Sequence, residues 1–551
     1  MEGKNEDPEI CPLKNEEEKG PENSQCISGQ KDIGHRIQSK ISHLSSWRTA
    51  AFFITLFLCL VVVFAFSFIL PCPVRAVSVR TWTRTFHNAG TYSFLTASDI
   101  NKDKVVDLLF ALKGSNSSLN VSCSDEGLPS PCGFLIALSG TNGSTLWERP
   151  VGKDILLIKC KLQMHDKTSG CVVLEKPNII TAFDLDTGHL LWNHTINLGS
   201  NATVLNPIVQ LPDMNGDGVD DILLAFTEGS TINGAALSGR DGNQIGQVVI
   251  HNVPTVTGFL LHKTNTGSHY LLVNTGKLVY GFALKDVYRP ETASLKQDSE
   301  WLKKKTASNS TSDYVLVYSS SDVRNVLTVP GQSPQNILAL SSSWTELLNG
   351  QNLRSLWKTN TSHVFNKPTF GMFKKDQVSV VIEDEYAAQS KKVLIIDSNS
   401  GNIMWEQDVI SKPGSPQPAT ISTVDHHSVF LFWGEIQSQS NVTVPYDEKH
   451  YLFAMHPKNF RFLLQLNNGT SNIMAFDALL FERGRHACYV LLTGPSAEEE
   501  LGTVSISKRK LKEDVVYSNV IRLSDDASSS DEDVKQLFLN LRFSSETLSK
   551  N

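Results

Sequence analysis

One uncharged apolar run near the N-terminus constrains this chain more than any other feature. It extends from Ala50 to Leu70, and its 21 residues include no charged side chain. A helix of that length crosses a hydrocarbon core of about 30 Å. Pro71 and Pro73 then end the helix, because proline cannot continue the backbone hydrogen bonds. We predict a transmembrane signal-anchor helix over residues 49–70.

Two alternatives for this run are less consistent with its length and place. A buried core helix seldom exceeds about 14 wholly apolar residues. A cleaved signal peptide has a shorter apolar region near the N-terminus, whereas 49 residues precede this run.

Glycosylation signals indicate which side of the membrane the larger part occupies. The basic residues near the run weakly favour a cytosolic N-terminus. Four precede the run (Lys31, Arg36, Lys40 and Arg48) and three follow it (Arg75, Arg80 and Arg84). All nine Asn-X-Ser/Thr acceptors follow the run: Asn116, Asn120, Asn142, Asn193, Asn201, Asn309, Asn360, Asn441 and Asn468. We expect a type II membrane glycoprotein with its C-terminal part in the lumen or outside the cell.

The rest of the 551 residues is too long for one ordinary domain and fits a large repeat array. A net charge of −7 argues against a general nucleic-acid binder, which needs a basic face. We expect residues 1–48 to be a disordered cytoplasmic tail and 71–523 to form the folded part. Residues 524–551 are acidic and serine-rich, and their apolar spacing from Val534 predicts a short helix that docks on the folded part.

The folded part has the composition of β structure. Short apolar runs rich in β-branched and aromatic residues alternate with turns of Gly, Asn, Asp and Ser, as in Val105–Leu112 and Val429–Trp433. A Gly turn followed by a Trp recurs at Gly143 and Trp147, then 45 residues later at Gly188 and Trp192, and again at Gly401 and Trp405. That period predicts propeller blades, with each Trp lying across the next blade.

We count about eight units, and seven stay an alternative. They cover residues 93–150, 154–200, 203–252, 255–290, 314–360, 365–412, 417–466 and 470–523. A strand around Trp82 without a blade of its own is expected to pair with the last blade and close the ring. Residues 286–313 are interpreted as a polar insertion between blades. The fold class is therefore all-β, a β-propeller on one transmembrane helix, and two tandem β-sandwiches are the alternative.

Two pairs of cysteines lie close together in sequence: Cys123 with Cys132, and Cys160 with Cys171. In an oxidising compartment each pair is expected to form a disulfide that closes a short loop. Free buried thiols are the alternative for each pair.

Two loops share one acidic spacing, with oxygen side chains at positions 1, 3, 5 and 9 and a backbone carbonyl at position 7. The first is Asp99, Asn101, Asp103, Val105 and Asp107, and the second is Asp213, Asn215, Asp217, Val219 and Asp221. Such a loop offers the six to eight oxygens that Ca²⁺ prefers. The second loop has Gly216 and Gly218 where the first has Lys102 and Lys104, so it is the better candidate. A metal-free network of Asx turns is the alternative.

These loops and turns resemble repeats of known protein families. The acidic loops resemble FG-GAP repeats of integrin α-chain propellers, and the Trp-ended turns resemble quinoprotein repeats. The chain as a whole resembles the single-pass membrane proteins called family with sequence similarity 234, described as integrin-α FG-GAP-repeat-containing. The resemblance rests on Pro71–Pro73, Asn142–Pro150, Leu191–Thr195, the Asp213 loop and Arg485–Pro495. It implies a type II membrane glycoprotein with an extracellular propeller, and it implies no defined activity.

Integrin ligand binding does not follow from this resemblance. The chain has few metal loops, no clear Phe-Gly…Gly-Ala-Pro cores and the opposite membrane orientation. The sequence also has no zinc-protease His-Glu-x-x-His, no Gly-x-Ser-x-Gly and no phosphate-binding loop.

We therefore expect a non-catalytic propeller at the cell surface that binds another protein or glycoprotein. A quinoprotein-like or glycan-processing enzyme that uses the propeller channel is one alternative. A folding or trafficking factor in a secretory-pathway membrane is another.

Overall fold

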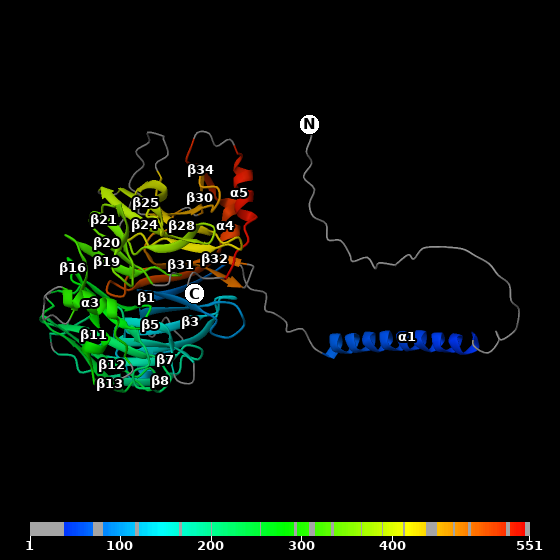
Figure 1. The fold of residues 1–551 in the computed structure, drawn as a ribbon, viewed down its shortest axis with the longest axis horizontal. Helices are drawn as coiled ribbons and strands as arrows, with labels where there is room; N and C mark the ends of the chain where they lie inside the picture. Colours follow the sequence, from blue (N-terminus) through cyan, green and yellow to red (C-terminus); the bar gives the residue numbers. More distant parts are fainter. Residues whose placement is uncertain are drawn as a thin grey trace, which may run out of the picture. The chain divides into compact units, whose positions relative to one another are not determined.

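A computed structural model describes residues 38–69, 81–115, 121–164, 168–199, 201–253, 255–290, 295–307, 314–331, 335–364, 366–387, 390–410, 414–436, 449–466, 469–482, 486–524 and 529–545. The chain has two compact units, residues 1–76 and 77–551. The first contains one long helix and the second contains all of the strands (Figure 1).

Helix α1 (Gln38–Ile69) contains residues 50–69 of the apolar run, and its segment Trp47–Phe64 is long and apolar enough to cross a membrane. The helix begins within the stretch that we expected to be a disordered tail. Residues 38–48 contain neither Gly nor Pro, and extending an existing helix costs far less than starting one. The apolar span therefore continues as a helix on its N-terminal side.

The strands of the second unit form successive antiparallel sheets. The first blade contains β2 (Asp107–Gly114), β3 (Cys132–Leu138) and β4 (Thr145–Val151), with η1 (Cys123–Glu126) between β2 and β3. The second contains β5 (Ile155–Gln163), β6 (Ser169–Glu175), β7 (Ile179–Asp184) and β8 (Leu190–Thr195). The third contains β9 (Thr203–Val204), β10 (Val209–Leu211), β11 (Asp221–Glu228), β12 (Thr231–Leu237), β13 (Gln244–Ile250) and β17 (Tyr288–Arg289).

The fourth blade contains β14 (Gly258–Lys263), β15 (His269–Asn274), β16 (Leu278–Ala283) and β18 (Tyr314–Ser319). The fifth contains β19 (Val323–Thr328), β20 (Ile337–Ser341), β21 (Trp344–Leu348) and β22 (Ser355–Asn360), and the sixth contains β23 (Thr369–Lys374), β24 (Gln377–Ala387), β25 (Ser390–Asp397) and β26 (Ile403–Ile410). The seventh contains β27 (Ala419–Ser422), β28 (Ser428–Gly434), β29 (Tyr451–Met455), β30 (Phe462–Gln465) and β34 (Asn519–Arg522).

Strand β1 (Trp82–Ser98) closes the ring by belonging to two blades. Its first half, Trp82 to Ala89, pairs with β33 (Gly502–Lys510), and its second half, Ala89 to Ser98, pairs with β2. The eighth blade is completed by β31 (Ile473–Glu482) and β32 (His486–Thr493), so one seven-stranded sheet contains both the last blade and the first. The expected eight-bladed propeller, closed by the Trp82 strand, is confirmed.

Tryptophans join neighbouring blades in the way that the repeat predicted. The ring of each Trp lies over a Gly in the turn of the next blade, and its indole N–H donates to a carbonyl of that turn. The pairs are Trp82 over Gly143, Trp147 over Gly188, Trp192 over Gly242 and Trp357 over Gly401, with N–H to O distances of 3.3, 3.2, 3.4 and 2.7 Å. Each Gly has a φ between 67° and 74°, and no Cβ fits beneath the ring.

The polar insertion lies inside the fourth blade, not between blades. Strand β18 pairs with β16, so the segment from α2 (Leu284–Val287) to α3 (Ser299–Ala307) connects two strands of one sheet. The expectation that Tyr314 starts the fifth blade is therefore corrected. The apolar run of β18 stands some thirty residues after β16, which is why its sequence resembles the start of a new blade.

The C-terminal segment returns to the propeller. Helices α4 (Leu511–Tyr517) and α5 (Asp531–Leu539) pack together (Figure 1), and β34 between them extends the seventh blade. Val534 and Phe538 of α5 are buried, as is Phe543 after it, in one cluster with side chains of the seventh and eighth blades. The amphipathic pattern that starts at Val534 thus corresponds to a docked helix.

Both predicted disulfides are present. Cys123 is joined to Cys132 across the connection from β2 to β3, and Cys160 is joined to Cys171 between paired strands β5 and β6.

The Trp–Gly contacts predict a measurable difference between two glycines of similar backbone geometry. Gly188 (φ 67°) would place a Cβ 2.6 Å from a ring carbon of Trp147, whereas Gly229 (φ 59°) has no atom within 4 Å of the added Cβ. Gly188→Ala and Gly229→Ala share a backbone cost of about 1–2 kcal/mol. We expect Gly188→Ala to cost about 1–3 kcal/mol more, because the ring must move. Equal Tm values for the two variants would contradict this role of the ring.

Candidate functional site

The two acidic loops occupy equivalent places in the first and third blades. Each connects the first and second strands of its blade, β1 to β2 and β10 to β11. Each also contacts the Gly turn between the third and fourth strands. Asp107 accepts from Gly140 N–H at 2.8 Å, and Asp221 accepts from Gly239 N–H at 3.4 Å. The shared spacing therefore gives a shared structure.

In the second loop the carboxylates bind the loop's own donors. Asp213 accepts N–H bonds from residues 216, 217 and 218 at 2.7–3.2 Å. Asp217 accepts from Val219 N–H at 2.9 Å and from the Ser238 hydroxyl at 3.0 Å. Asn215 accepts from Asp217 N–H, and buried Asp221 accepts from Met214 N–H at 2.6 Å.

The first loop repeats this network without glycines. Asp99 accepts from residue 104, Asn101 from Asp103, Asp103 from Val105, and Asp107 from residues 100 and 101. Lys102 and Lys104 adopt the positive φ that Gly216 and Gly218 adopt in the second loop. The Lys102 ammonium lies 2.7 Å from Asp186 in the next blade, so it is directed away from the loop carboxylates.

This geometry is that of hydrogen-bonded Asx turns. Within the described ranges, no group of three or more His, Cys, Asp or Glu side chains is placed to hold a metal ion. Burial raises the pKa of Asp107 and of Asp221 to about 6. The backbone N–H bonds to these carboxylates lower the pKa, but their effect is smaller than that of burial. The carboxylates of both loops accept backbone N–H bonds in this structure, and calcium binding stays a prediction.

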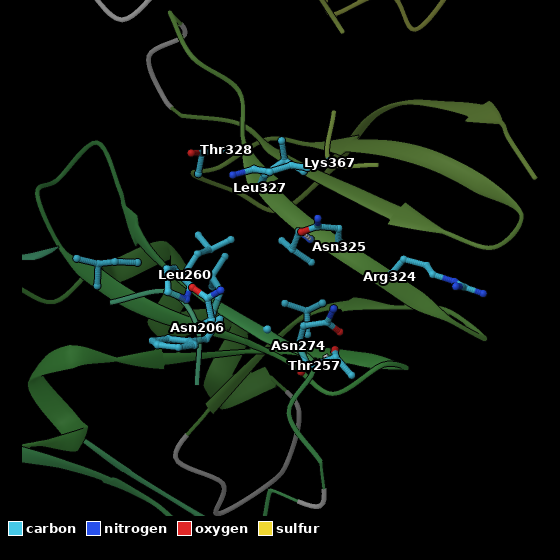
Figure 2. Close-up of a pocket in the computed structure, with 16 residues that line it drawn as sticks. Asn206, Thr257, Leu260, Asn274, Arg324, Asn325, Leu327, Thr328 and Lys367 are labelled. Carbon is cyan, nitrogen blue, oxygen red and sulfur yellow. Dashed lines mark hydrogen bonds between the residues drawn. The ribbon is translucent and has the colours of Figure 1, made fainter. Parts of the chain in front are cut away.

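A cavity of about 460 Å³ opens beside the propeller axis. The first strands of successive blades contact one another, as β10 does with β14, β14 with β19, and β31 with β1, which places these strands around the axis. Strands β14 and β19 supply the facing walls of the cavity (Figure 2). Leu260 and Leu327 contribute apolar surface, and Asn206, Asn274 and Asn325 contribute amides.

The charges of this cavity are few. Arg324 and Lys367 line it, and its sixteen described lining residues include no Asp, Glu, His, Cys or Tyr. Arg324 donates to Asp322 at 2.8 Å and points away from the other labelled side chains (Figure 2). The cavity therefore offers amides, hydroxyls and one lysine around an apolar floor.

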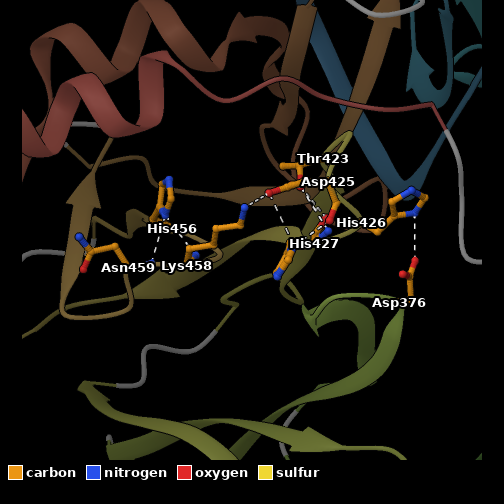
Figure 3. A network of polar contacts seen from close by, with 8 residues as sticks. All are labelled: Asp376, Thr423, Asp425, His426, His427, His456, Lys458 and Asn459. Carbon is orange, nitrogen blue, oxygen red and sulfur yellow. Dashed lines mark hydrogen bonds and ion pairs between the residues drawn. The ribbon is translucent and has the colours of Figure 1, made fainter. Parts of the chain in front are cut away.

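A polar cluster that the sequence did not reveal joins two turns of the seventh blade (Figure 3). Asp425 accepts from the Thr423 hydroxyl at 2.5 Å and forms an ion pair with Lys458. His426 lies 3.1 Å from Asp376 of the sixth blade, and His427 lies 2.9 Å from the Asp425 carbonyl. The adjacent histidines belong to a turn and contact different partners.

His456 links this cluster to the C-terminal helix. Its Nδ1 accepts N–H bonds from Lys458 and Asn459 at 3.2 and 3.1 Å. Its ring packs edge-on against Phe538 of α5, with centroids 5.2 Å apart. Burial lowers the pKa of His456 to about 4, and the charge of Asp425 opposes this shift.

The fourth and fifth blades are joined without a tryptophan from an outer strand. His262 Nε2 donates to Gly350 O at 2.8 Å, and its ring stacks on fully buried Trp301 of α3, with centroids 5.5 Å apart. Buried Asp298 accepts from Thr266 and Gln351, both at 2.7 Å. Sequence reasoning missed this junction because Asp298 and Trp301 come from an insertion outside the repeat pattern.

Four of the nine glycosylation acceptors lie within the described residues, and all four asparagines are exposed. Asn142 is in the β3–β4 turn, Asn193 is on β8, Asn201 follows β8, and Asn360 ends β22. Asn116, Asn120, Asn309, Asn441 and Asn468 lie outside the described residues.

The acidic loop predicts a stability defect that does not depend on calcium. Asp221→Ala removes the acceptor of two buried N–H groups, so we expect a loss of roughly 2–4 kcal/mol. Asp220→Ala is the matched control, because the Asp220 carboxylate accepts from the exposed Gln210 side chain at 2.7 Å and not from a buried N–H group of the described residues. Thermal unfolding in EGTA and in calcium should show the same defect. A defect confined to calcium-containing buffer would instead support a bound ion.

His456 predicts that α5 docks less tightly in acid. The ordinary histidine pKa is 6.5, so between pH 6.5 and about 4 the exposed ring binds a proton that the buried ring does not. The docking free energy is fully present above pH 6.5 and is lost as the pH falls toward 4. We expect amide-exchange protection of α5 to drop on the order of tenfold between pH 7.5 and 5.0. His456→Asn keeps an acceptor for the turn and should abolish this drop; an unchanged drop would exclude His456 as its cause.

Comparisons with known proteins agree with this architecture. A family model described as FAM234A/B beta-propeller matches residues 82–544. Protein FAM234A of Homo sapiens is 40% identical over 548 residues, covering 98% of this chain and 98% of that protein. Protein FAM234B of Homo sapiens is 29% identical over 508 residues, covering 87% of this chain and 80% of that protein.

A likeness to solved structures is weaker. The WD40 domain of SCAP from fission yeast aligns with 78% of this chain and covers 98% of its own chain. The sequence identity is 10% and the TM-score is 0.40. The family model and the full-length relatives confirm the resemblance drawn from the sequence. The chain belongs to the FAM234A/B β-propeller family.

Proposed function

We propose that this chain is a type II membrane glycoprotein of the cell surface whose propeller binds another protein of the same membrane. The observation that carries the proposal is a set of exposed apolar side chains on the C-terminal helices. Val516 and Tyr517 at the end of α4 are 51% and 85% exposed, and Leu537 on α5 is 39% exposed. These three residues are called the α4–α5 patch below.

The patch is held in a fixed shape. Lys535 of α5 donates to the Val516 carbonyl at 3.1 Å, and Lys512 of α4 donates to the Leu539 carbonyl at 2.5 Å. The buried side chains of both helices belong to one cluster with the seventh and eighth blades. An exposed Tyr on a rigid support suits a binding hot spot, because little side-chain entropy is lost on binding.

The start of the propeller supports a partner in the same membrane. Thr81 donates to Glu513 of α4 at 2.8 Å, so the chain enters the propeller beside the patch. Only eleven residues, 70–80, separate Thr81 from the end of α1. Eleven residues span at most about 40 Å when fully extended, so we infer that a partner in the same membrane is within reach.

A channel enzyme is the second candidate, and the cavity chemistry is the reason to rank it lower. General acid–base or covalent catalysis uses His, Asp, Glu, Cys, Lys or Tyr at the reacting atoms. Of these, the described lining offers Lys367. Amides and hydroxyls around an apolar floor suit recognition better than turnover.

Site-specific photo-crosslinking in cells tests the α4–α5 patch. Benzoylphenylalanine replaces Tyr517 in one variant and Tyr386 of β24 in the control; Tyr386 is also exposed, at 51%. We expect a discrete crosslinked species from position 517 and little from position 386. A Val516→Asp change in the first variant should remove that species, because a charge is costly in an apolar contact. Equal crosslinking at both positions would exclude the patch as the interface.

Surface biotinylation followed by endoglycosidase H tests the membrane assignment. A type II protein of the cell surface should show a biotinylated pool with resistant glycans. Wholly sensitive glycans without a surface pool would favour the alternative of a folding or trafficking factor. The absence of any glycan would contradict the type II topology.

A further inference from the structure

A groove of about 400 Å³ runs between the first and second blades, away from the propeller axis. One side is the outer strand β4 with the residues after it, and the other side is β7 with β8, the outer strands of the second blade. The groove contains a glycosylation acceptor, Asn193, among its lining residues.

The strand geometry directs Asn193 into this groove. Side chains alternate along β8, so Trp192 and His194 share one face and Asn193 has the other. Trp192 lies over Gly242 and His194 lies 3.0 Å from the Asp241 carbonyl, both in the third blade. Asn193 therefore faces the first blade, and its exposed side chain stands in the groove.

The groove has an apolar wall that is partly uncovered. Leu190 is 54% exposed, and Pro150, Val151, Ile179 and Phe183 continue the apolar lining. Leucine exposed to this degree beside a cavity favours contact with an apolar face of a ligand.

The groove also has a donor that lacks an acceptor. Arg149 lines it, and the Nε of Arg149 is a buried nitrogen without a hydrogen-bond partner among the described residues. Its Nη2 lies 3.3 Å from His189 Nδ1. The Nη2 end of the guanidinium is exposed, so it can donate to an acceptor in the groove.

We propose that the first sugars of an N-glycan on Asn193, N-acetylglucosamine units, are seated in this groove and bridge the two blades. Such a sugar has an apolar ring face and an acetamido methyl for the Leu190 wall. It also has an amide carbonyl and hydroxyls that accept from Arg149. The volume suits a small saccharide. The inference rests on the glycoprotein assignment under "Proposed function". It adds the place on the propeller where the glycan of Asn193 binds.

The seat predicts that this glycan is protected in the folded protein. Full-length protein from mammalian cells is treated with peptide N-glycosidase F under native conditions, and each acceptor is followed by mass spectrometry of its peptide. We expect release at Asn193 to be at least tenfold slower than at Asn142, which stands in an exposed turn. After denaturation the two rates should be equal.

Variants show whether the groove causes the protection. Leu190→Ser and Arg149→Leu should each speed release at Asn193 and leave Asn142 and Asn360 unchanged. Leu356→Ser is the matched control, because Leu356 is 47% exposed on an outer strand of the fifth blade, close in sequence to Asn360. Thermal unfolding of each variant identifies any that misfold, and the wild-type comparison of Asn193 with Asn142 needs no variant.

The outcomes separate this inference from the proposed function. Release at Asn193 as fast as at Asn142, or an unmodified Asn193 beside other modified acceptors, would overturn the seat and leave the glycoprotein assignment intact. An absence of glycan at every acceptor would overturn both.

Discussion

The pairing of one strand with two blades is the constraint on which the rest of this structure depends. The N-terminal half of β1 completes the eighth blade, and its C-terminal half begins the first. An open ring would expose two sheet edges, each with a row of unpaired backbone groups. Trp82 reinforces the closure, since the first residue of this strand also covers Gly143 in the turn of the first blade.

The same contact then repeats around the ring and determines where other residues lie. Each Trp–Gly contact fixes a turn, and in the first and third blades that turn donates an N–H group to the acidic loop. Where the outer strand of the fourth blade lacks the tryptophan, His262 and Trp301 make a substitute contact. In this way the contacts between neighbouring blades position both the acidic loops and the insertion.

The sequence predicted those features that are local and repeated. The Gly and Trp spacing indicated the blade type, because each copy obeys the same packing rule. The count of apolar units predicted about eight blades, with seven as the alternative. The strand of Trp82 was assigned to the last blade for a physical reason, the exposed edge. The acidic spacing identified two equivalent loops. The carboxylates of these loops accept backbone N–H bonds, which cannot be predicted from side-chain identity alone.

Features assembled from distant segments were not predictable in this way. The contact of His456 with Phe538 joins a turn of the seventh blade to a helix some eighty residues later. The groove at Asn193 depends on Arg149 from another blade. Strand β18 was assigned to the wrong blade because a long insertion separates it from its partner β16. No short motif encodes such contacts, since they follow from the order of the blades.

Function on this scaffold follows from what the closed ring leaves exposed. The blades bury their apolar faces against one another, and the α4–α5 patch and the Asn193 groove stay open at the periphery. A rigid ring presents such surfaces without an entropic cost of ordering them at each encounter. The channel cavity, with its amides and few charges, is a further recognition surface of the same ring.

Native-state hydrogen exchange of the full-length protein tests the closure most directly. If β1 locks the ring, those amides of residues 82–89 that are hydrogen-bonded to β33 should exchange only through global unfolding, at the slow rate of the core strand β32. Exchange of residues 82–89 that is orders of magnitude faster than that of β32 would show that the ring opens at this strand, and would contradict the account.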